Sequence, residues 1–187
     1  MANNINTQDF VNRKVQRINL ANNIKKVIEL NEGKKYIPYE DSKGIMHIGI
    51  GFNLEDKDNQ RFLKDSLNLT INDLKKEGFK LNENQVTKLY NHSISKAYID
   101  AKKYDPNFDS RPKNVKVALL DMSVNLGLPR LNKVKKMKKG LEENNYNTVV
   151  KEMKDSLWYD QVKSRGPRML KVMSSEDNLN NLFNSLK

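Results

Sequence analysis

Only one segment of this chain, residues 36–53, has the pattern of β-structure, and this limits the folds that are open to it. Pro38 cannot occupy a helix interior, and the stretch Asp41-Ser-Lys-Gly44 has the composition of a turn. Apolar β-branched residues alternate with other residues after the turn, which indicates a strand. The segment therefore predicts a single β-hairpin in a chain that is otherwise helical.

Apolar residues recur at helical spacing on both sides of this hairpin. Residues 8–30 fit one helix, or two short helices that meet near Asn22-Asn23, and Gly33 should end this region. Asn82 can cap a long helix over residues 83–103. Further helices fit residues 113–126, 130–139, 143–156, 166–174 and 177–186, with Gly127, Gly140 and Gly166 in the breaks between them.

These elements predict an α+β fold, mainly helical, in a single domain over residues 1–187. Residues 22–82 would form a small lobe with the hairpin, after an N-terminal extension over residues 1–21. The helix over residues 83–103 would cross to a helical bundle lobe over residues 104–187. Such a layout offers a cleft between the lobes, where ligand sites tend to form.

The composition excludes several classes of function. The chain has no Cys, so disulfides, thiolate catalysis and Cys-ligated zinc are ruled out. It has only two His, which argues against a His-rich metal site. No apolar run approaches the roughly 18 to 20 residues of a membrane-spanning helix. The first residues lack the apolar core and the cleavage site of a signal peptide, so we expect synthesis in a cytoplasm.

The net charge of +11 points to an anionic partner without naming one. A basic surface attracts nucleic acid, anionic lipid or the polyanions of a cell envelope. The lysines between Lys133 and Lys139 also fit a solvated helix face. The charge alone leaves these alternatives open.

Three polar residues gather around the predicted hairpin: Glu32 before Gly33, Asp41 in the turn, and His47 on the second strand. Strand alternation places His47 on the same face as Gly51, and glycine lets a ligand approach the backbone. Glycoside hydrolysis needs a carboxylic acid that protonates the leaving oxygen and a second carboxylate. The three residues are therefore catalytic candidates, although ordinary surface, turn and structural roles fit their spacing as well.

Three blocks of the sequence resemble the phage-type lysozymes, the glycoside hydrolase family 24 muramidases best known from T-even phages. Residues 31–33 (Asn-Glu-Gly), 39–44 (Tyr-Glu-Asp-Ser-Lys-Gly) and 47–51 (His-Ile-Gly-Ile-Gly) resemble the active-site signature. Residues 120–127 resemble the core helix of the family. Residues 156–168 resemble a later Ser-x-Trp-Tyr-x-Gln segment and the Arg pair that follows it. The resemblance covers the chain from about residue 22 to the end.

The resemblance implies a two-lobed lysozyme-like fold. It also implies hydrolysis of the β-1,4 bond between N-acetylmuramic acid and N-acetylglucosamine in bacterial peptidoglycan, with no metal or cofactor. Glu32 would be the general acid, Asp41 the second carboxylate, and Arg165 the partner of Glu32. An Arg neighbour favours the ionised carboxylate, whereas a general acid has to carry a proton, so partial burial must offset the pair.

Four residues are substrate-binding candidates on the same grounds: Gly51, Asp121, Asn125 and Arg165. Asp121 and Asn125 match cleft-facing polar positions and could bind the N-acetyl or hydroxyl groups of a sugar. Hydrogen bonds between helices would explain these two side chains equally well. Trp158 is expected to belong to the core.

The sequence departs from the family pattern at three positions of the first block. His47 stands where the family has Thr, which together with the Asp is expected to hold the attacking water. An imidazole can activate water, which gives inversion, or attack the carbon itself, which gives a covalent intermediate and retention. We favour water activation. Phe52 replaces a His and Asn31 a common Asp, and we expect both changes to affect stability more than chemistry.

The resemblance implies an endolysin-type bacteriolytic protein that acts in host lysis. It would be made in the host bacterial cytoplasm and delivered to the wall by a holin. A phage tail lysozyme or an injected antimicrobial effector fits as well. Peptidoglycan would be the partner of a monomer that neither inserts stably into membranes nor binds nucleic acid. Two other classes remain open: a lysozyme-like protein that binds glycan without cutting it, and a basic nucleic-acid binder.

Overall fold

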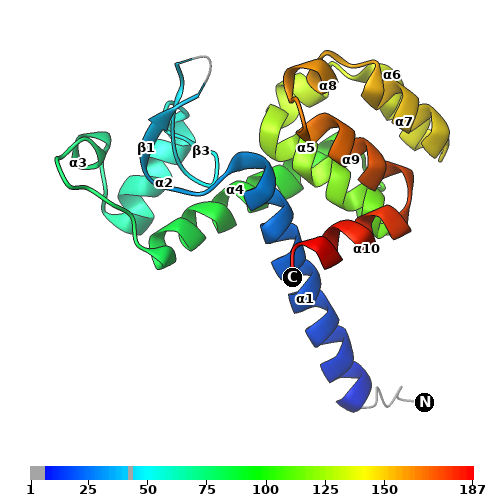
Figure 1. Ribbon diagram of the computed structural model, residues 1–187, viewed down its shortest axis with the longest axis horizontal. Helices are drawn as coiled ribbons and strands as arrows, with labels where there is room; N and C mark the ends of the chain where they lie inside the picture. Colours follow the sequence, from blue (N-terminus) through cyan, green and yellow to red (C-terminus); the bar gives the residue numbers. More distant parts are fainter. Residues whose placement is uncertain (1–6, 42–43) are drawn as a thin grey trace.

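The computed structural model describes residues 7–41 and 44–187, with side chains from residue 15 onward. The fold is mainly helical with one small antiparallel sheet, so the predicted α+β class is confirmed (Figure 1). Residues 1–6 of the predicted N-terminal extension, and residues 42 and 43 of the predicted turn, lie outside the described residues.

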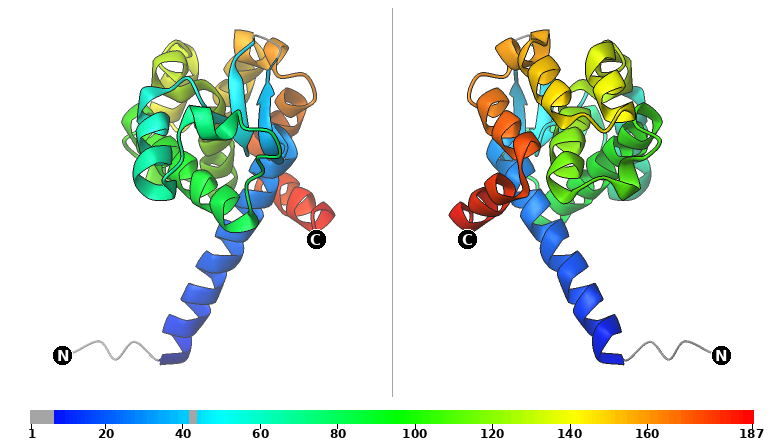
Figure 2. Two further views of the ribbon diagram at one scale, coloured as in Figure 1. Left: turned by 90° about the vertical axis from the view of Figure 1, so that its left-hand side faces the viewer. Right: turned by 90° about the vertical axis from the view of Figure 1, so that its right-hand side faces the viewer.

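The N-terminal region forms one helix, α1 (Thr7–Glu32), and not two. Its first part projects away from the rest of the molecule (Figure 2), where Val15 and Ile18 are 49% and 51% exposed. The helix joins the body near its C-terminal end, where Val27 and Ile28 are buried. Among the helices within the described residues, none combines the length and apolar composition that a bilayer crossing requires.

The predicted hairpin is present and carries a third strand. Strands β1 (Lys35–Glu40), β2 (Met46–Gly49) and β3 (Phe52–Asn53) form an antiparallel sheet in the order β1-β2-β3. Tyr39 of β1 pairs with His47 of β2, and His47 pairs in turn with Asn53 of β3. The register of β1 shifts in the stretch that contains Pro38, which has no N–H to donate to a neighbouring strand.

Two short helices of this region were not predicted from the sequence. In α2 (Lys57–Leu67) the side chain of Asp56 caps the first turn by accepting from the N–H groups of Asp58 and Asn59. Helix α3 (Ile71–Leu74) is a single turn closed by a capping box of Thr70 and Asp73. A helix of one turn is too short to show a hydrophobic period.

The long helix α4 (Glu83–Tyr104) joins the sheet region to the second half of the chain, and its cap is Asn82, as predicted. The second half begins with the 3₁₀ turn η1 (Phe108–Ser110). A bundle of helices follows: α5 (Lys113–Leu131), α6 (Lys135–Glu142), α7 (Tyr146–Lys154), α8 (Leu157–Gln161), α9 (Arg165–Ser174) and α10 (Glu176–Ser185). Helix α5 packs against both α4 and α9.

The three predicted glycine breaks have different outcomes. Gly127 has non-helical angles (φ 64°, ψ 165°) and kinks α5, as expected of a break. The prediction for Gly140 was wrong, because this residue lies inside α6. A Cβ on Gly140 would lie 3.1 Å from a methyl of Val149, so the glycine lets α7 pack closely on α6. Gly166 lies in the first turn of α9, against Tyr159.

The buried apolar side chains form two clusters, which we call the small-lobe core and the helical-lobe core. The sheet, α2 and the first half of α4 supply the small-lobe core, and α5 to α10 with the second half of α4 supply the helical-lobe core. The consecutive residues Val27 and Ile28 of α1 belong to different cores. The C-terminal end of α1 therefore lies where the two cores meet.

Candidate active site

Glu32 is the last residue of α1, and the way this helix ends fixes its position. Gly33 follows with φ +75°, a left-handed conformation that glycine adopts without strain. Its N–H donates to the carbonyl of Glu29 at 2.8 Å, and the chain then turns into β1. The Glu32 side chain is 17% exposed, so it is mostly buried but still reachable by solvent.

A buried guanidinium holds this carboxylate from the helical lobe. Arg165 begins α9, and its Nη1 donates to Oε1 of Glu32 at 2.5 Å. Its Nε donates to Oδ2 of Asp121 at 2.8 Å, and its Nη2 donates to the Asp121 carbonyl at 3.0 Å. The pairing of Glu32 with Arg165 that the family resemblance implied is therefore present.

Two carboxylates keep the Arg165 guanidinium charged despite its burial. Burial alone would lower the pKa of Arg165, but Asp121 and Glu32 outweigh this effect and raise its pKa above the usual range. The side chain of Asp121 is 0% exposed, so it has no surface to offer to a sugar. Asp121 thus has the interhelical hydrogen bonds that were the alternative to sugar binding, and they support Arg165.

Asn31 and Arg168 extend this network. The Asn31 amide donates to Oδ1 of Asp121 at 2.7 Å, which occupies the second oxygen of that carboxylate. Arg168 donates in turn to the amide oxygen of Asn31. Asn31, which replaces a common Asp of the family pattern, thus joins the C-terminal end of α1 to α5 and α9.

Gly51 touches the candidate acid directly. It has φ +66° in the turn between β2 and β3, and a Cβ on it would lie 2.9 Å from Oε2 of Glu32. Only a residue without a side chain fits against the carboxylate in this place. Gly51 therefore packs against Glu32, and its contact with a sugar stays a prediction.

Asp41 follows β1 and shapes the turn toward β2. Its Oδ1 accepts from the N–H of Ile45 at 3.0 Å, and its backbone N–H donates to the Ile45 carbonyl at 3.0 Å. The Gly44 N–H donates to the Asp41 carbonyl. One carboxylate oxygen of Asp41 is thus fixed by the turn itself.

His47 lies across from Tyr39 on the neighbouring strand. The ring centroids are 5.8 Å apart with an angle of 28° between the planes, so the two rings stack. Nδ1 of His47 lies 2.9 Å from the carbonyl oxygen of Ile45. A carbonyl oxygen only accepts, so Nδ1 carries the hydrogen, and in the neutral ring Nε2 holds the free lone pair.

Tyr39 is a site residue that the sequence analysis quoted only within a motif. Burial raises the pKa of its hydroxyl, as do the negative charges of Glu32 and Asp41, while the Gly51 backbone lowers it. Both candidate carboxylates therefore act electrostatically on the same hydroxyl group. The predicted hairpin was the available signal for this residue, because Tyr39 lies on the strand that pairs with the strand of His47.

Asn125 lies one turn after Asp121 on α5 and contacts α8. Its Oδ1 accepts from the indole N–H of Trp158 at 3.1 Å. Trp158 is 3% exposed and belongs to the helical-lobe core, as expected. Asn125 thus has the interhelical hydrogen bond that was the alternative to sugar binding.

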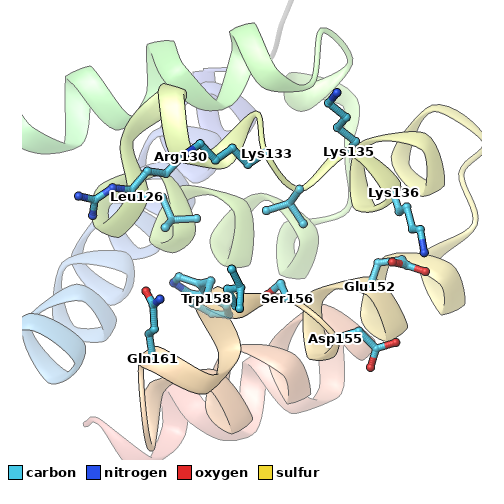
Figure 3. A pocket seen from close by; sticks show the side chains of 12 residues that line it. Leu126, Arg130, Lys133, Lys135, Lys136, Glu152, Asp155, Ser156, Trp158 and Gln161 are labelled. Atoms are coloured by element: carbon cyan, nitrogen blue, oxygen red, sulfur yellow. The ribbon is translucent and has the colours of Figure 1, made fainter.

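A cavity of about 580 Å³ opens beside this hydrogen bond (Figure 3). Apolar side chains of α5 and α8, including Leu126 and Trp158, form one part of its lining, and Gln161 reaches into the same space. None of its lining residues is a predicted catalytic residue. Within the described part of the chain, no group of three or more His, Asp or Glu side chains is placed to hold a metal ion.

The arrangement brings together a partly exposed carboxylate with a fixed cation, a second carboxylate in a turn, and an imidazole with an available lone pair. Such a set can donate a proton and accept another, which is the requirement of general acid–base chemistry. Glu32 lies against both Arg165 and Gly51, and Tyr39, near the Gly51 backbone, stacks on His47. Asp121 supports this group through its hydrogen bonds with Arg165. Asn125 bonds to Trp158 and is not part of the group.

The chain matches no protein-family model. It is 25% identical over 173 residues to Probable T4-type lysozyme 1 of Dictyostelium discoideum, a match that covers 83% of this chain and 96% of that protein. It is 23% identical over 163 residues to Probable T4-type lysozyme 2 of the same organism, again with 83% and 96% covered. Similarity over nearly the whole length of both relatives, together with the mainly helical α+β fold, relates this chain to the T4-type lysozymes.

Proposed function

We propose that this protein is a lysozyme, a glycosidase that hydrolyses the β-1,4 bond between N-acetylmuramic acid and N-acetylglucosamine in bacterial peptidoglycan. One observation carries the proposal: Glu32, held by Arg165, packs against Gly51 just after the strand β2 that carries His47, and Asp41 closes the turn that leads into the same strand. Two carboxyl groups on either side of the scissile bond are what glycoside hydrolysis requires. The names of the two relatives support the same reaction class.

Glu32 is the general acid in this proposal. It gives its proton to the leaving oxygen and becomes a carboxylate at that moment. Arg165, with Nη1 2.5 Å from Oε1, then faces a full negative charge that it stabilises. The pair with Arg165 therefore assists the step in which the proton leaves.

Asp41 and His47 act on the water in this proposal. Nε2 of His47 takes a proton from the water, whose oxygen then bonds to the anomeric carbon and inverts its configuration. Asp41, fixed in the turn by the Ile45 N–H, keeps its charge near the positive centre that develops on the sugar. The second possibility is that Nε2 attacks the carbon itself, which gives retention.

The substitution Glu32→Gln tests the proposal, and Glu29→Gln, one turn earlier on α1, is its control. Glu29 makes a loose pair with Lys25 at 3.9 Å and has no contact with Arg165. Glu32→Gln should lower the rate of glycan release from purified peptidoglycan at least about 10²-fold. Glu29→Gln should keep the rate of the wild type. Full activity of Glu32→Gln would exclude the acid role of Glu32.

The ends of the products decide the chemistry in more detail. Mass spectrometry should find reducing muramic acid ends, whereas anhydro ends would identify a lytic transglycosylase instead. Proton NMR of the first anomer released should show the α form if water attacks. A β product would indicate that His47 attacks the carbon and that the water mechanism is wrong.

The biological setting belongs to the same proposal. We place the protein among endolysin-type enzymes that lyse a host bacterium as monomers and reach the wall through a holin or an injection apparatus. Expression in a bacterium should cause lysis only when a pore-forming partner is co-expressed. Wild-type peptidoglycan binding without cleavage would favour a glycan-binding protein, and salt-sensitive DNA retention in filter binding would favour a nucleic-acid binder.

A further inference from the structure

The imidazole of His47 is held on two sides by groups that lie outside the catalytic set named so far. On one side the Ile45 carbonyl accepts the hydrogen of Nδ1 at 2.9 Å. On the other side the Tyr39 ring stacks on the imidazole from the paired position of the adjacent strand. Directly opposed side chains of an antiparallel pair are close enough to interact in this way.

Tyr39 is itself anchored at its far end. Its hydroxyl lies near the Gly51 backbone, which lowers the pKa of that hydroxyl, and Gly51 in turn packs against the Glu32 carboxylate. A continuous series of contacts therefore runs from Glu32 through Gly51 and Tyr39 to His47. A shift of the Tyr39 ring would therefore move the imidazole of His47. A shift of the turn at Gly51 would move both Glu32 and Tyr39.

We propose that Tyr39 is a positioning residue for His47: together with the Ile45 carbonyl, its ring holds the imidazole in the Nδ1–H tautomer and leaves Nε2 as the proton acceptor. The inference rests on the proposed function and deepens it. In the reaction an O–H bond of water breaks and its proton goes to Nε2, while the water oxygen bonds to the anomeric carbon. The glycosidic C–O bond breaks, and its oxygen takes the proton of Glu32.

Nitrogen-15 NMR of the full chain measures the tautomer without any substrate. The chain has only two histidines, and the variant His92→Phe assigns the signals of His47 by elimination. In the neutral ring, the wild type should show a single Nδ1–H tautomer. A predominant Nε2–H tautomer in the wild type would overturn the inference before any tyrosine is changed.

Substitutions at Tyr39 separate the ring from the hydroxyl. Tyr39→Leu removes the stack and should give a mixture of tautomers, with kcat on soluble glycan reduced about tenfold or more. KM should stay nearly constant, because Tyr39 acts through His47 and not on the sugar. Tyr39→Phe keeps the ring and should keep the Nδ1–H tautomer with a smaller loss of kcat.

Tyr36→Leu is the matched control on the same strand. Tyr36 also lies on β1 and is partly exposed, but its hydroxyl contacts Glu83, away from His47. Tyr36→Leu should change neither the tautomer nor kcat. An unchanged Nδ1–H tautomer together with full kcat in Tyr39→Leu would refute the positioning role.

The two proposals fail in different ways. If the wild type cleaves no glycan, the proposed function fails, while the NMR comparison of wild type with Tyr39→Leu still decides the role of Tyr39. If the wild type cleaves glycan and Tyr39→Leu behaves like the wild type in both measurements, only the positioning role is lost.

Discussion

At the scale of single residues, Gly51 carries two constraints that can be separated by experiment. Its left-handed backbone excludes a side chain on grounds of strain, and its contact with Glu32 excludes one on grounds of space. Gly78 has a similar φ of +75°, but nothing lies within 4 Å of the Cβ that it lacks. The two glycines therefore differ only in what their surroundings contain.

We expect Gly51→Ala and Gly78→Ala to lower the free energy of unfolding by a similar amount, about 1–2 kcal/mol, because both put a Cβ into the left-handed region. The Cβ of Gly51→Ala would meet Oε2 at the end of the Glu32 side chain, which can shift slightly while Oε1 keeps its pair with Arg165, so the contact adds little to the cost. It does, however, move the acid, so only Gly51→Ala should lose most of its activity. Urea unfolding and glycan release measure the two effects, and equal activity of the two variants would contradict the assignment.

His92 is a second residue with a specific consequence, since its ring is packed between other rings. It stacks on Phe62 with centroids 4.0 Å apart, and its Nε2 is buried without a hydrogen-bond partner among the described residues. Burial lowers the pKa of His92 and so does Lys96, while Asp56 and Asp58 oppose the shift. The folded protein therefore favours the neutral ring.

This lowered pKa makes stability dependent on pH. The contribution is fully present above the unfolded-state pKa of about 6.5 and is lost as the pH falls through the lower pKa of the folded state, because the unfolded chain binds the proton more readily. His92→Phe should therefore lose less free energy of unfolding between about pH 7.5 and about pH 5.5 than the wild type does. Parallel stability curves for the two proteins would show that another group is responsible.

At the scale of elements, the site depends on a junction of three helices. The C-terminal end of α1, the middle of α5 and the start of α9 meet through Asn31, Asp121 and Arg165. Asp121 and Arg165 are both almost fully buried, and a buried charge that loses its partner is strongly destabilising. The junction therefore holds the two lobes in register around Glu32.

Asp121→Ala should lower the free energy of unfolding by about 3–5 kcal/mol, because it leaves the buried guanidinium of Arg165 with one carboxylate instead of two. Asp109→Ala is the control, since Asp109 pairs with Lys102 at 2.6 Å on the exposed surface and should matter far less. Thermal and urea unfolding compare the two. A loss for Asp121→Ala no larger than that for Asp109→Ala would contradict the supporting role of Asp121.

The elements also show what a sequence can and cannot reveal. The hairpin, α4 and the end of α1 at Gly33 follow from local signals: a proline, turn residues, caps and apolar spacing. The prediction of a helix break at Gly140 was wrong, because this glycine allows close contact with Val149 of another helix. No local sequence pattern shows such a contact. The burial of Asp121 and the contact of Gly51 with Glu32 were not visible in the sequence for the same reason, since both appear only after folding.

At the scale of the whole molecule, the positive charge is spread unevenly. Five lysines and no acidic residue lie between Lys133 and Lys139, and four of the five are exposed. The fifth, Lys138, lies with its Nζ 5.9 Å from the centre of the Tyr104 ring. These lysines lie in the helical lobe, and none of them contacts Glu32, Asp41 or His47 through a hydrogen bond or ion pair within the described residues.

Changing these five lysines to glutamine should slow the lysis of whole cells severalfold at low salt, because long-range attraction to an anionic envelope speeds encounter. Added salt should reduce the difference, since it screens exposed charges. Cleavage of short soluble glycans should stay close to that of the wild type. Equal loss on cells and on short glycans would mean that the lysines act at the cleavage site.

The contact between Glu32 and Arg165 also has a consequence for biosynthesis. The two residues are 133 positions apart, and Arg165 begins one of the last helices of the chain. A chain made from its N-terminus exposes Glu32, Asp41 and His47 long before Arg165 and the rest of α9 exist. A nascent chain therefore carries its acid without the cation that fixes it until α9 has been synthesised.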